Sequence, residues 1–258
     1  MTQNDLSLGS SVSLPSSKPE GYSEMLSGMK EHSFYPYADN GGSIVGISGS
    51  DFAVLAGDTR STSGYSINSR SEPKVFRVGD DGRIALSVVG FAADGKALAE
   101  KLDTTCNMYK YRHGKTISLT ACAHRLSTLL YEKRFFPYQV QAILMGLDED
   151  GRGTLYSYDP AGSYKKDQCR AVGAAASLMM PFLDNQVQFN NQHLPGSGIG
   201  IALKEKPKED LSKDAVMDLV KDAFCNATER HIEVGDGLQM MLVSRDGIEE
   251  MFIPLKRD

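Results

Sequence analysis

The sequence predicts an α+β fold, namely a four-layer αββα sandwich in which two antiparallel sheets pack together and a pair of helices covers each outer side. Three observations indicate this fold. Short apolar segments come in pairs joined by tight turns, two helical segments follow the first hairpins, and two further helical segments precede the last hairpin. With 258 residues, of which 41% are hydrophobic and 24% charged, the chain is long enough to bury a sizeable core.

Two hairpins open the predicted domain. Residues 43–47 and 52–56 are apolar and rich in β-branched side chains, and Gly49-Ser50-Asp51 between them favours a turn. Residues 74–78 and 83–89 form a second pair, joined across a turn with glycine at both ends. Such pairs are typical of antiparallel sheets.

Helical spacing follows. Apolar side chains recur every three or four residues at positions 98, 102, 106 and 109, and again at positions 119, 123, 126 and 130. His113-Gly114 separates these two predicted helices, and we expect Pro137 to end the second.

The second half of the chain repeats this order. Strands are predicted at residues 141–146 and 154–158, around an acidic turn that lacks the remaining ligands of a calcium loop. A helix at residues 177–183 precedes a polar loop at residues 190–207. Its glycines at 196–200 are a weak candidate for phosphate binding, because they lack the GxGxxG spacing and a preceding strand.

The clearest helix covers residues 212–230. Ala215, Val216, Leu219, Val220 and Ala223 lie on one stripe, with charged residues off it. Two strands, at residues 238–244 and 249–253, close the domain.

Two regions are expected along the chain. Residues 1–32 are serine-rich with few large apolar groups, so we predict a disordered leader, followed by a single domain at residues 33–258. The first residues lack the charged and apolar regions of a secretory signal, and the first arginine is Arg60, which does not fit a mitochondrial presequence. We therefore expect a cytoplasmic and nuclear protein.

Composition excludes several classes of function. A net charge of −5 argues against a nucleic-acid partner, and the lack of a long apolar segment argues against a membrane span. The four cysteines are far apart in sequence and are interpreted as reduced thiols, and the five histidines lack zinc-site spacing. No metal and no cofactor are predicted.

Eight short motifs are informative when taken together. They are Gly41-Gly42-Ser43-Ile44, Leu55-Ala56-Gly57-Asp58-Thr59-Arg60, Pro73-Lys74-Val75-Phe76, Arg134-Phe135-Phe136-Pro137-Tyr138, Gly146-Leu147-Asp148-Glu149-Asp150-Gly151, Tyr156-Ser157-Tyr158-Asp159-Pro160, Asp184-Asn185-Gln186 and Gly235-Asp236-Gly237. With them, residues 34–258 resemble the β subunits of the proteasome core particle, a family of N-terminal-nucleophile hydrolases. The resemblance is greatest to the non-catalytic subunits at the beta-6 position.

The resemblance implies where a catalytic site would lie. In active members, the hydroxyl of an N-terminal threonine is the nucleophile and its α-amine accepts the proton. An aspartate follows sixteen residues later, and a lysine sixteen residues after that. Asp58 and Lys74 have this spacing, and the residue sixteen before Asp58 is Gly42, which has no hydroxyl. We therefore expect Asp58 and Lys74 to form a structural buried pair, in which loss of one partner costs about 3–5 kcal/mol.

Other polar positions of the family also differ here. The resemblance places Ala174 where active members have a serine, and His231 and Val234 where they have an aspartate and a serine. It further implies that Gly41-Gly42 cannot cleave itself, so that active neighbours trim the leader, near His32 and Ser33.

The implied function is a non-catalytic structural subunit in ubiquitin-proteasome protein degradation. Its partners would be the other β subunits of its ring, the α-ring subunits and the opposite β ring. Two alternatives stay open. One is an active hydrolase with Ser43 as nucleophile, although a shift of one residue turns a strand side chain to the opposite face. The other is an unrelated α/β binding module.

Overall fold

The computed structural model describes residues 35–79, 83–195, 202 and 204–257. Residues 37–258 form one compact unit, which is the part considered below. The predicted leader at residues 1–32, the expected cut near His32 and Ser33, and the glycines at 196–200 lie outside the described residues. The domain boundaries at residues 32 and 33 therefore stay a prediction.

The first sheet carries the start of the domain and its end. Its strand order is β10-β1-β2-β11-β12, and all neighbouring strands are antiparallel. The strands are β1 (Ser43–Ser48), β2 (Ala53–Asp58), β10 (Cys169–Gly173), β11 (Gly237–Ser244) and β12 (Gly247–Pro254). The β1–β2 hairpin and the closing β11–β12 hairpin confirm the predicted strand pairs.

The second sheet follows chain order, β5-β6-β7-β8-β9, and is also antiparallel. It contains β5 (Val75–Val78), β6 (Ile84–Gly90), β7 (Val140–Leu147), β8 (Gly153–Tyr158) and β9 (Tyr164–Asp167). A separate small hairpin is formed by β3 (Ser61–Ser63) and β4 (Ser66–Ser69). This hairpin, β9 and β10 were not predicted from the sequence.

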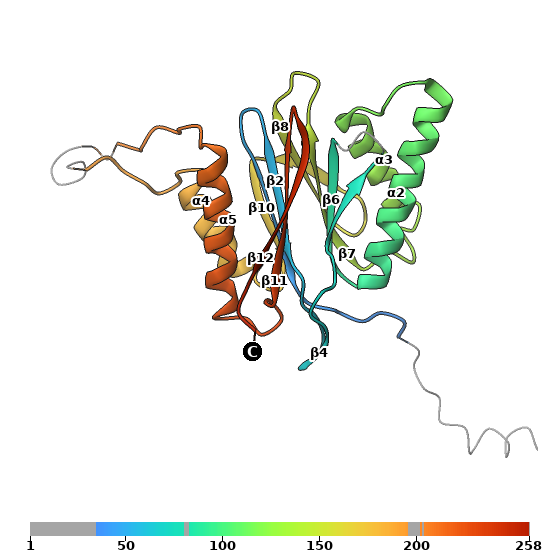
Figure 1. Ribbon diagram of the computed structural model, residues 1–258, viewed down its shortest axis with the longest axis horizontal. Helices are drawn as coiled ribbons and strands as arrows, with labels where there is room; N and C mark the ends of the chain where they lie inside the picture. Colours follow the sequence, from blue (N-terminus) through green and yellow to red (C-terminus); the bar gives the residue numbers. More distant parts are fainter. Residues whose placement is uncertain (1–34, 80–82, 196–201, 203, 258) are drawn as a thin grey trace, which may run out of the picture. The chain divides into compact units, whose positions relative to one another are not determined.

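In the described part of the chain, four helices cover the outer faces of the two sheets (Figure 1). The pair α2 (Ala92–His113) and α3 (Leu119–Tyr131) lies against the second sheet, and the pair α4 (Ala176–Gln186) and α5 (Lys213–Thr228) lies against the first. The result is the predicted αββα sandwich.

Helix boundaries follow from capping groups. The Ser118 and Ser212 side chains accept hydrogen bonds from the backbone N–H groups of Ala121 and Ala215 and begin α3 and α5. Gly114 adopts a left-handed conformation with φ of 65° and ends α2, as the sequence predicted.

The end of α3 differs from the prediction. The helix stops at Tyr131, before Pro137 is reached, and a series of tight turns covers the residues between them. The side chains of residues 131–136 are all exposed, so no buried face holds the helix beyond Leu130. The apolar stripe, rather than the proline, sets this boundary.

Three apolar clusters fill the space between the four layers. One lies between α4, α5 and the first sheet, and a second lies between α2, α3 and the second sheet. The third lies between the two sheets and includes Ile44, Leu55, Ile143 and Leu155. Side chains of β1 alternate between clusters, since Ile44 faces the second sheet and Val45 faces the helices.

Candidate functional site

The residues at the predicted catalytic position lie where β1 begins and β2 ends. Ile44 pairs with Gly57, which places the start of β1 beside the end of β2. The Asp58 carboxylate is fully buried there, and its Oδ1 accepts a hydrogen bond of 2.7 Å from the backbone N–H of Ser43. Its Oδ2 accepts a second bond, of 3.2 Å, from the N–H of Arg60.

Lys74 reaches this carboxylate from the residue before β5. Its Nζ donates hydrogen bonds to the carbonyl oxygens of Asp58 and Arg60, at 2.9 and 2.6 Å. The same Nζ lies 3.5 Å from Oδ1 of Asp58, and the side chain is 7% exposed. The pair therefore joins β2 in the first sheet to the start of β5 in the second.

Burial shifts the pKa values of both partners towards their neutral forms. It raises the pKa of Asp58, against the opposing effects of the Lys74 ammonium and of backbone hydrogen bonds from Ser43, Arg60 and Gly235. It lowers the pKa of Lys74, and the Asp58 carboxylate opposes that shift. Each charge thus offsets part of the other's desolvation, and removal of one leaves the other uncompensated.

A side chain at position 42 would require Lys74 to move. A Cβ built on it would lie 2.2 Å from Cε and 2.6 Å from Nζ of Lys74, and 2.9 Å from Oδ1 of Asp58. Its φ of 81° is also in the left-handed region, which residues other than glycine rarely adopt. The Lys74 side chain therefore occupies the space in which a side chain at position 42 would lie.

Ser43, the alternative nucleophile, points to the other face of β1. Its Oγ accepts a hydrogen bond of 2.8 Å from the backbone N–H of Ala175, at the start of α4, and the side chain is fully buried. Only its backbone N–H faces Asp58. The hydroxyl is thus separated from the Asp58–Lys74 pair by the strand itself.

The chain upstream of Gly42 is bound to the domain. The Asn40 backbone N–H donates to the carbonyl of Gly90 at 3.1 Å, and its carbonyl accepts from the N–H of Thr62 at 2.9 Å. Its side-chain Oδ1 accepts from the N–H of Ala92 at 2.9 Å. Tyr37 is anchored further upstream, where its hydroxyl donates to the carbonyl of Pro137 at 2.8 Å.

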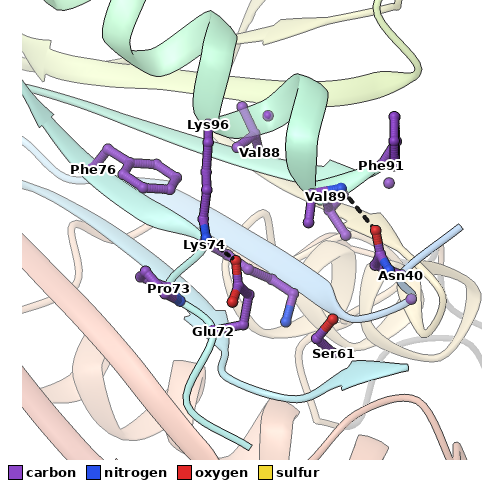
Figure 2. Close-up of a pocket in the computed structure, with 14 residues that line it drawn as sticks. Asn40, Ser61, Glu72, Pro73, Lys74, Phe76, Val88, Val89, Phe91 and Lys96 are labelled. Atoms are coloured by element: carbon purple, nitrogen blue, oxygen red, sulfur yellow. Dashed lines mark hydrogen bonds and ion pairs between the residues drawn. The ribbon is translucent and has the colours of Figure 1, made fainter. Parts of the chain in front are cut away.

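A small pocket opens beside this upstream segment, between Asn40, Lys74 and the start of α2 (Figure 2). Its volume is about 20 Å³, enough for roughly one water molecule. Figure 2 shows Lys96 crossing from α2 to Glu72, with Nζ 2.6 Å from Oε1 of Glu72. A pocket of this size does not admit a peptide side chain.

The other predicted positions lie around the same strand ends in different roles. The Ala174 N–H donates to the carbonyl of Gly42 at 2.9 Å, so a backbone group sits close to the predicted nucleophile position. Val234 is fully buried in the cluster under α4 and α5. Nδ1 of His231 accepts a hydrogen bond of 3.3 Å from the N–H of Glu233, within its own turn.

Sequence reasoning missed a second buried ionic group beside this site. The Arg60 Nε donates to Oδ2 of Asp236 at 2.7 Å, and Arg70 forms a salt bridge with the other carboxylate oxygen. Both Arg60 and Asp236 are almost fully buried. Arg60 and Asp236 belong to motifs that support the family resemblance, but no role was assigned to either residue. Because they are 176 positions apart in the sequence, their pairing becomes visible only in the folded structure.

Burial acts to raise the pKa of Asp236, but hydrogen bonds and charges from Arg60 and Arg70 outweigh it and hold that pKa below its usual range. Asp236 is therefore ionised in the folded protein. Its N–H and carbonyl also bond to Lys256 and Leu255, which fixes the entry to β11.

Among the described residues, no group of three or more His, Cys, Asp or Glu side chains is arranged to hold a metal ion. Within the same residues, no helix has the length and apolar character needed to cross a membrane.

Comparison with known proteins identifies the relatives of this chain. Residues 38–194 match the family model described as Proteasome subunit. The chain is 56% identical to proteasome subunit beta type-6 of Saccharomyces cerevisiae. The alignment spans 229 residues, which are 88% of this chain and 93% of the relative. It is 45% identical to probable proteasome subunit beta type-6 of Schizosaccharomyces pombe over an alignment of 230 residues, which are 89% of this chain and 100% of the relative. It is 41% identical to proteasome subunit beta type-1 of Danio rerio over an alignment of 235 residues, which are 90% of this chain and 92% of the relative.

Lys74→Met tests the coupling of the buried pair. This change leaves the Asp58 carboxyl buried without its cation, and we expect it to lower the free energy of unfolding by about 3–5 kcal/mol. Adding Asp58→Asn removes the stranded charge, so the double variant should be more stable than the Lys74→Met single variant. Denaturant unfolding of the full chain measures the free energy of unfolding of the two single variants, Lys74→Met and Asp58→Asn, and of the double variant. Lys101→Met is the control, because the Lys101–Glu132 pair is exposed and should contribute less than about 1 kcal/mol. Additive single effects in the double variant would contradict the coupling.

Asp236 makes stability depend on pH in the acid range. Because its folded pKa lies below the unfolded value of 3.8, the unfolded chain binds the proton first. The contribution of Asp236 is complete above the unfolded pKa and is lost as pH falls through the folded pKa. Between about pH 5 and pH 2, the free energy of unfolding should fall less steeply in Asp236→Asn than in the wild type. Arg70→Gln should give an intermediate slope, and equal slopes in wild type and Asp236→Asn would refute the assignment.

Proposed function

Because this chain belongs to the proteasome subunit family, we propose that it is a non-catalytic, structural β subunit of the proteasome core particle. One observation carries the non-catalytic part of this proposal. The Lys74 ammonium and Cε fill the space where the side chain of an N-terminal nucleophile would have to lie, next to Gly42.

The hydroxyl that Gly42 lacks is not supplied by its neighbour in sequence. Ser43 is the adjacent candidate, but its Oγ is bonded to the N–H of Ala175 and lies on the helix side of β1. A nucleophile of this family also needs a free α-amine as its base. Here the chain continues upstream of Gly42, and Asn40 is held by both Gly90 and Thr62.

Substrate binding at the site is also unsupported by its shape. The pocket beside Lys74 has a volume of about 20 Å³, and the upstream segment lines it. The residues that replace polar supports of active members, Ala174, His231 and Val234, contribute a backbone N–H, a local turn contact and an apolar side chain. None of these contacts gives the site a proton-transfer group.

The role that remains is architectural. We place the chain in a β ring, in contact with neighbouring β subunits, with an α ring and with the opposite β ring, where it forms part of the wall of the proteolytic chamber. Such a subunit takes part in protein degradation without a metal or cofactor of its own, in the cytoplasm and nucleus. The alternative of an unrelated α/β module does not account for the family match over residues 38–194.

The test is to isolate this chain under native conditions from its own cells. We expect it to migrate with a very large complex that has peptidase activity, and to begin near Ser33 by mass and N-terminal sequencing, after trimming by active neighbours. A small monomer in gel filtration would overturn the assembly. A chain beginning at Ser43 would overturn the non-catalytic assignment and favour the Ser43 alternative.

Gly42→Thr tests whether the nucleophile alone is missing. We expect no peptidase activity from this subunit, because Cβ at position 42 meets Lys74 at 2.2 Å and the upstream chain keeps the α-amine in a peptide bond. The measurement is labelling by a covalent probe that reacts with N-terminal threonine, in complexes that have incorporated the variant.

The active subunits of the same complexes provide the positive control for that probe, and Gly42→Ala provides a matched variant without a hydroxyl. Specific labelling of the Gly42→Thr subunit would show that the remaining site is competent.

A further inference from the structure

Two of the four cysteines meet beneath the helix pair α2–α3, far from the site at Gly42. Cys106 on α2 and Cys122 on α3 are both buried, and their Sγ atoms are 3.7 Å apart. We propose that this is a redox-modification site, at which a small peroxide converts the two thiols into a disulfide that links α2 to α3. This inference goes beyond the structural role proposed above and does not rest on it.

The geometry already places the two sulfur atoms in contact. A disulfide bond is about 2.05 Å long, so the Sγ atoms must approach by about 1.7 Å. Both cysteines face the seam between the helices, where Leu102 and Leu126, one helical turn away on each helix, are also buried. Formation of the bond requires rotation of the two side chains and an adjustment of the helices that together close this gap.

A route for a small oxidant runs along the same seam. A groove of about 620 Å³ lies between α2 and α3. Its lining includes Thr105 and Ala121, which directly precede the two cysteines, and Tyr109 and Arg125, which lie three residues after them. The two cysteines are buried and do not line the groove, so the reaction requires a local opening of the helices that exposes the sulfur atoms to peroxide there.

The chemistry balances with hydrogen peroxide as the oxidant. The thiolate of one cysteine attacks the O–O bond, which gives a sulfenic acid and a hydroxide that leaves as water after taking up the thiol proton. The second thiol attacks the sulfenic sulfur, so the S–S bond forms, the S–O bond breaks and a second water leaves. Two thiols and one peroxide thus yield one disulfide and two waters.

The remaining cysteines serve as internal controls. Cys169 is buried in the cluster on the far side of both sheets, beside Nε2 of Gln188 at 3.3 Å. Cys225 is exposed on α5. Cys169 tests whether burial alone permits oxidation, and Cys225 reports that the peroxide has reacted.

The experiment uses the full chain with increasing hydrogen peroxide, followed by unfolding, alkylation of free thiols and peptide mass mapping. In native buffer we expect Cys106–Cys122 to be the main intramolecular link, with links to Cys169 nearly absent, because Cys169 lies beyond both sheets. A thiol reductant should remove it. In denaturant, links to Cys169 should appear beside it, and Cys106–Cys122 should keep only the several-fold preference that its shorter loop gives an unfolded chain. A Cys225→Ser background prevents links between chains.

Two variants keep the result interpretable. Cys106→Ser should abolish the linked peptide. If the buried hydroxyl of that variant prevents folding, Cys106→Ala is used in its place. The proposal would be overturned if Cys106 and Cys122 stayed reduced and alkylatable in the wild type at a peroxide concentration that fully oxidises Cys225. Links to Cys169 in the same proportion in the native and in the denatured chain would also overturn it, since the folded geometry would then have no part in the choice of partner.

Discussion

The buried pair of Asp58 and Lys74 is the interaction on which the arrangement of this domain depends. Asp58 ends the central strand of one sheet and Lys74 precedes an edge strand of the other, so one ion pair links the two sheets. The carboxylate also fixes the start of β1 through the Ser43 N–H. Since the ammonium needs the space beside position 42, glycine there follows from the same interaction.

Strand alternation decides the chemistry at this site. Positions 42 and 44 face the second sheet, whereas Ser43 and Val45 face the helices. The Ser43 hydroxyl therefore lies on the wrong face, where it accepts a hydrogen bond from the backbone N–H of Ala175, the residue before α4. Every layer of the sandwich is present around this strand start.

The sequence predicted the layer order, the four helices and the central strands, because these have strong apolar patterns. It missed β9, whose residues Tyr164–Asp167 are mostly charged and exposed, and the serine-rich β3–β4 hairpin, since pairing partners rather than burial define such strands. The spacing of Asp58 and Lys74 pointed to a buried pair, which the structure contains. The Arg60–Asp236 pair joins distant segments and leaves no local pattern, so single-chain reasoning had nothing from which to infer it.

The anchoring of residues 37–41 has a consequence for how precisely any cut upstream of it would have to be placed. An enzyme that works through a terminal amine must be cut at one peptide bond, because an error of one residue removes its base. Here Tyr37 and Asn40 tie the upstream chain to Pro137, Gly90 and Thr62, and no terminal group takes part in those contacts. Any break before Tyr37 leaves the same set of bonds, so a population with ragged ends would be structurally uniform from Tyr37 onwards.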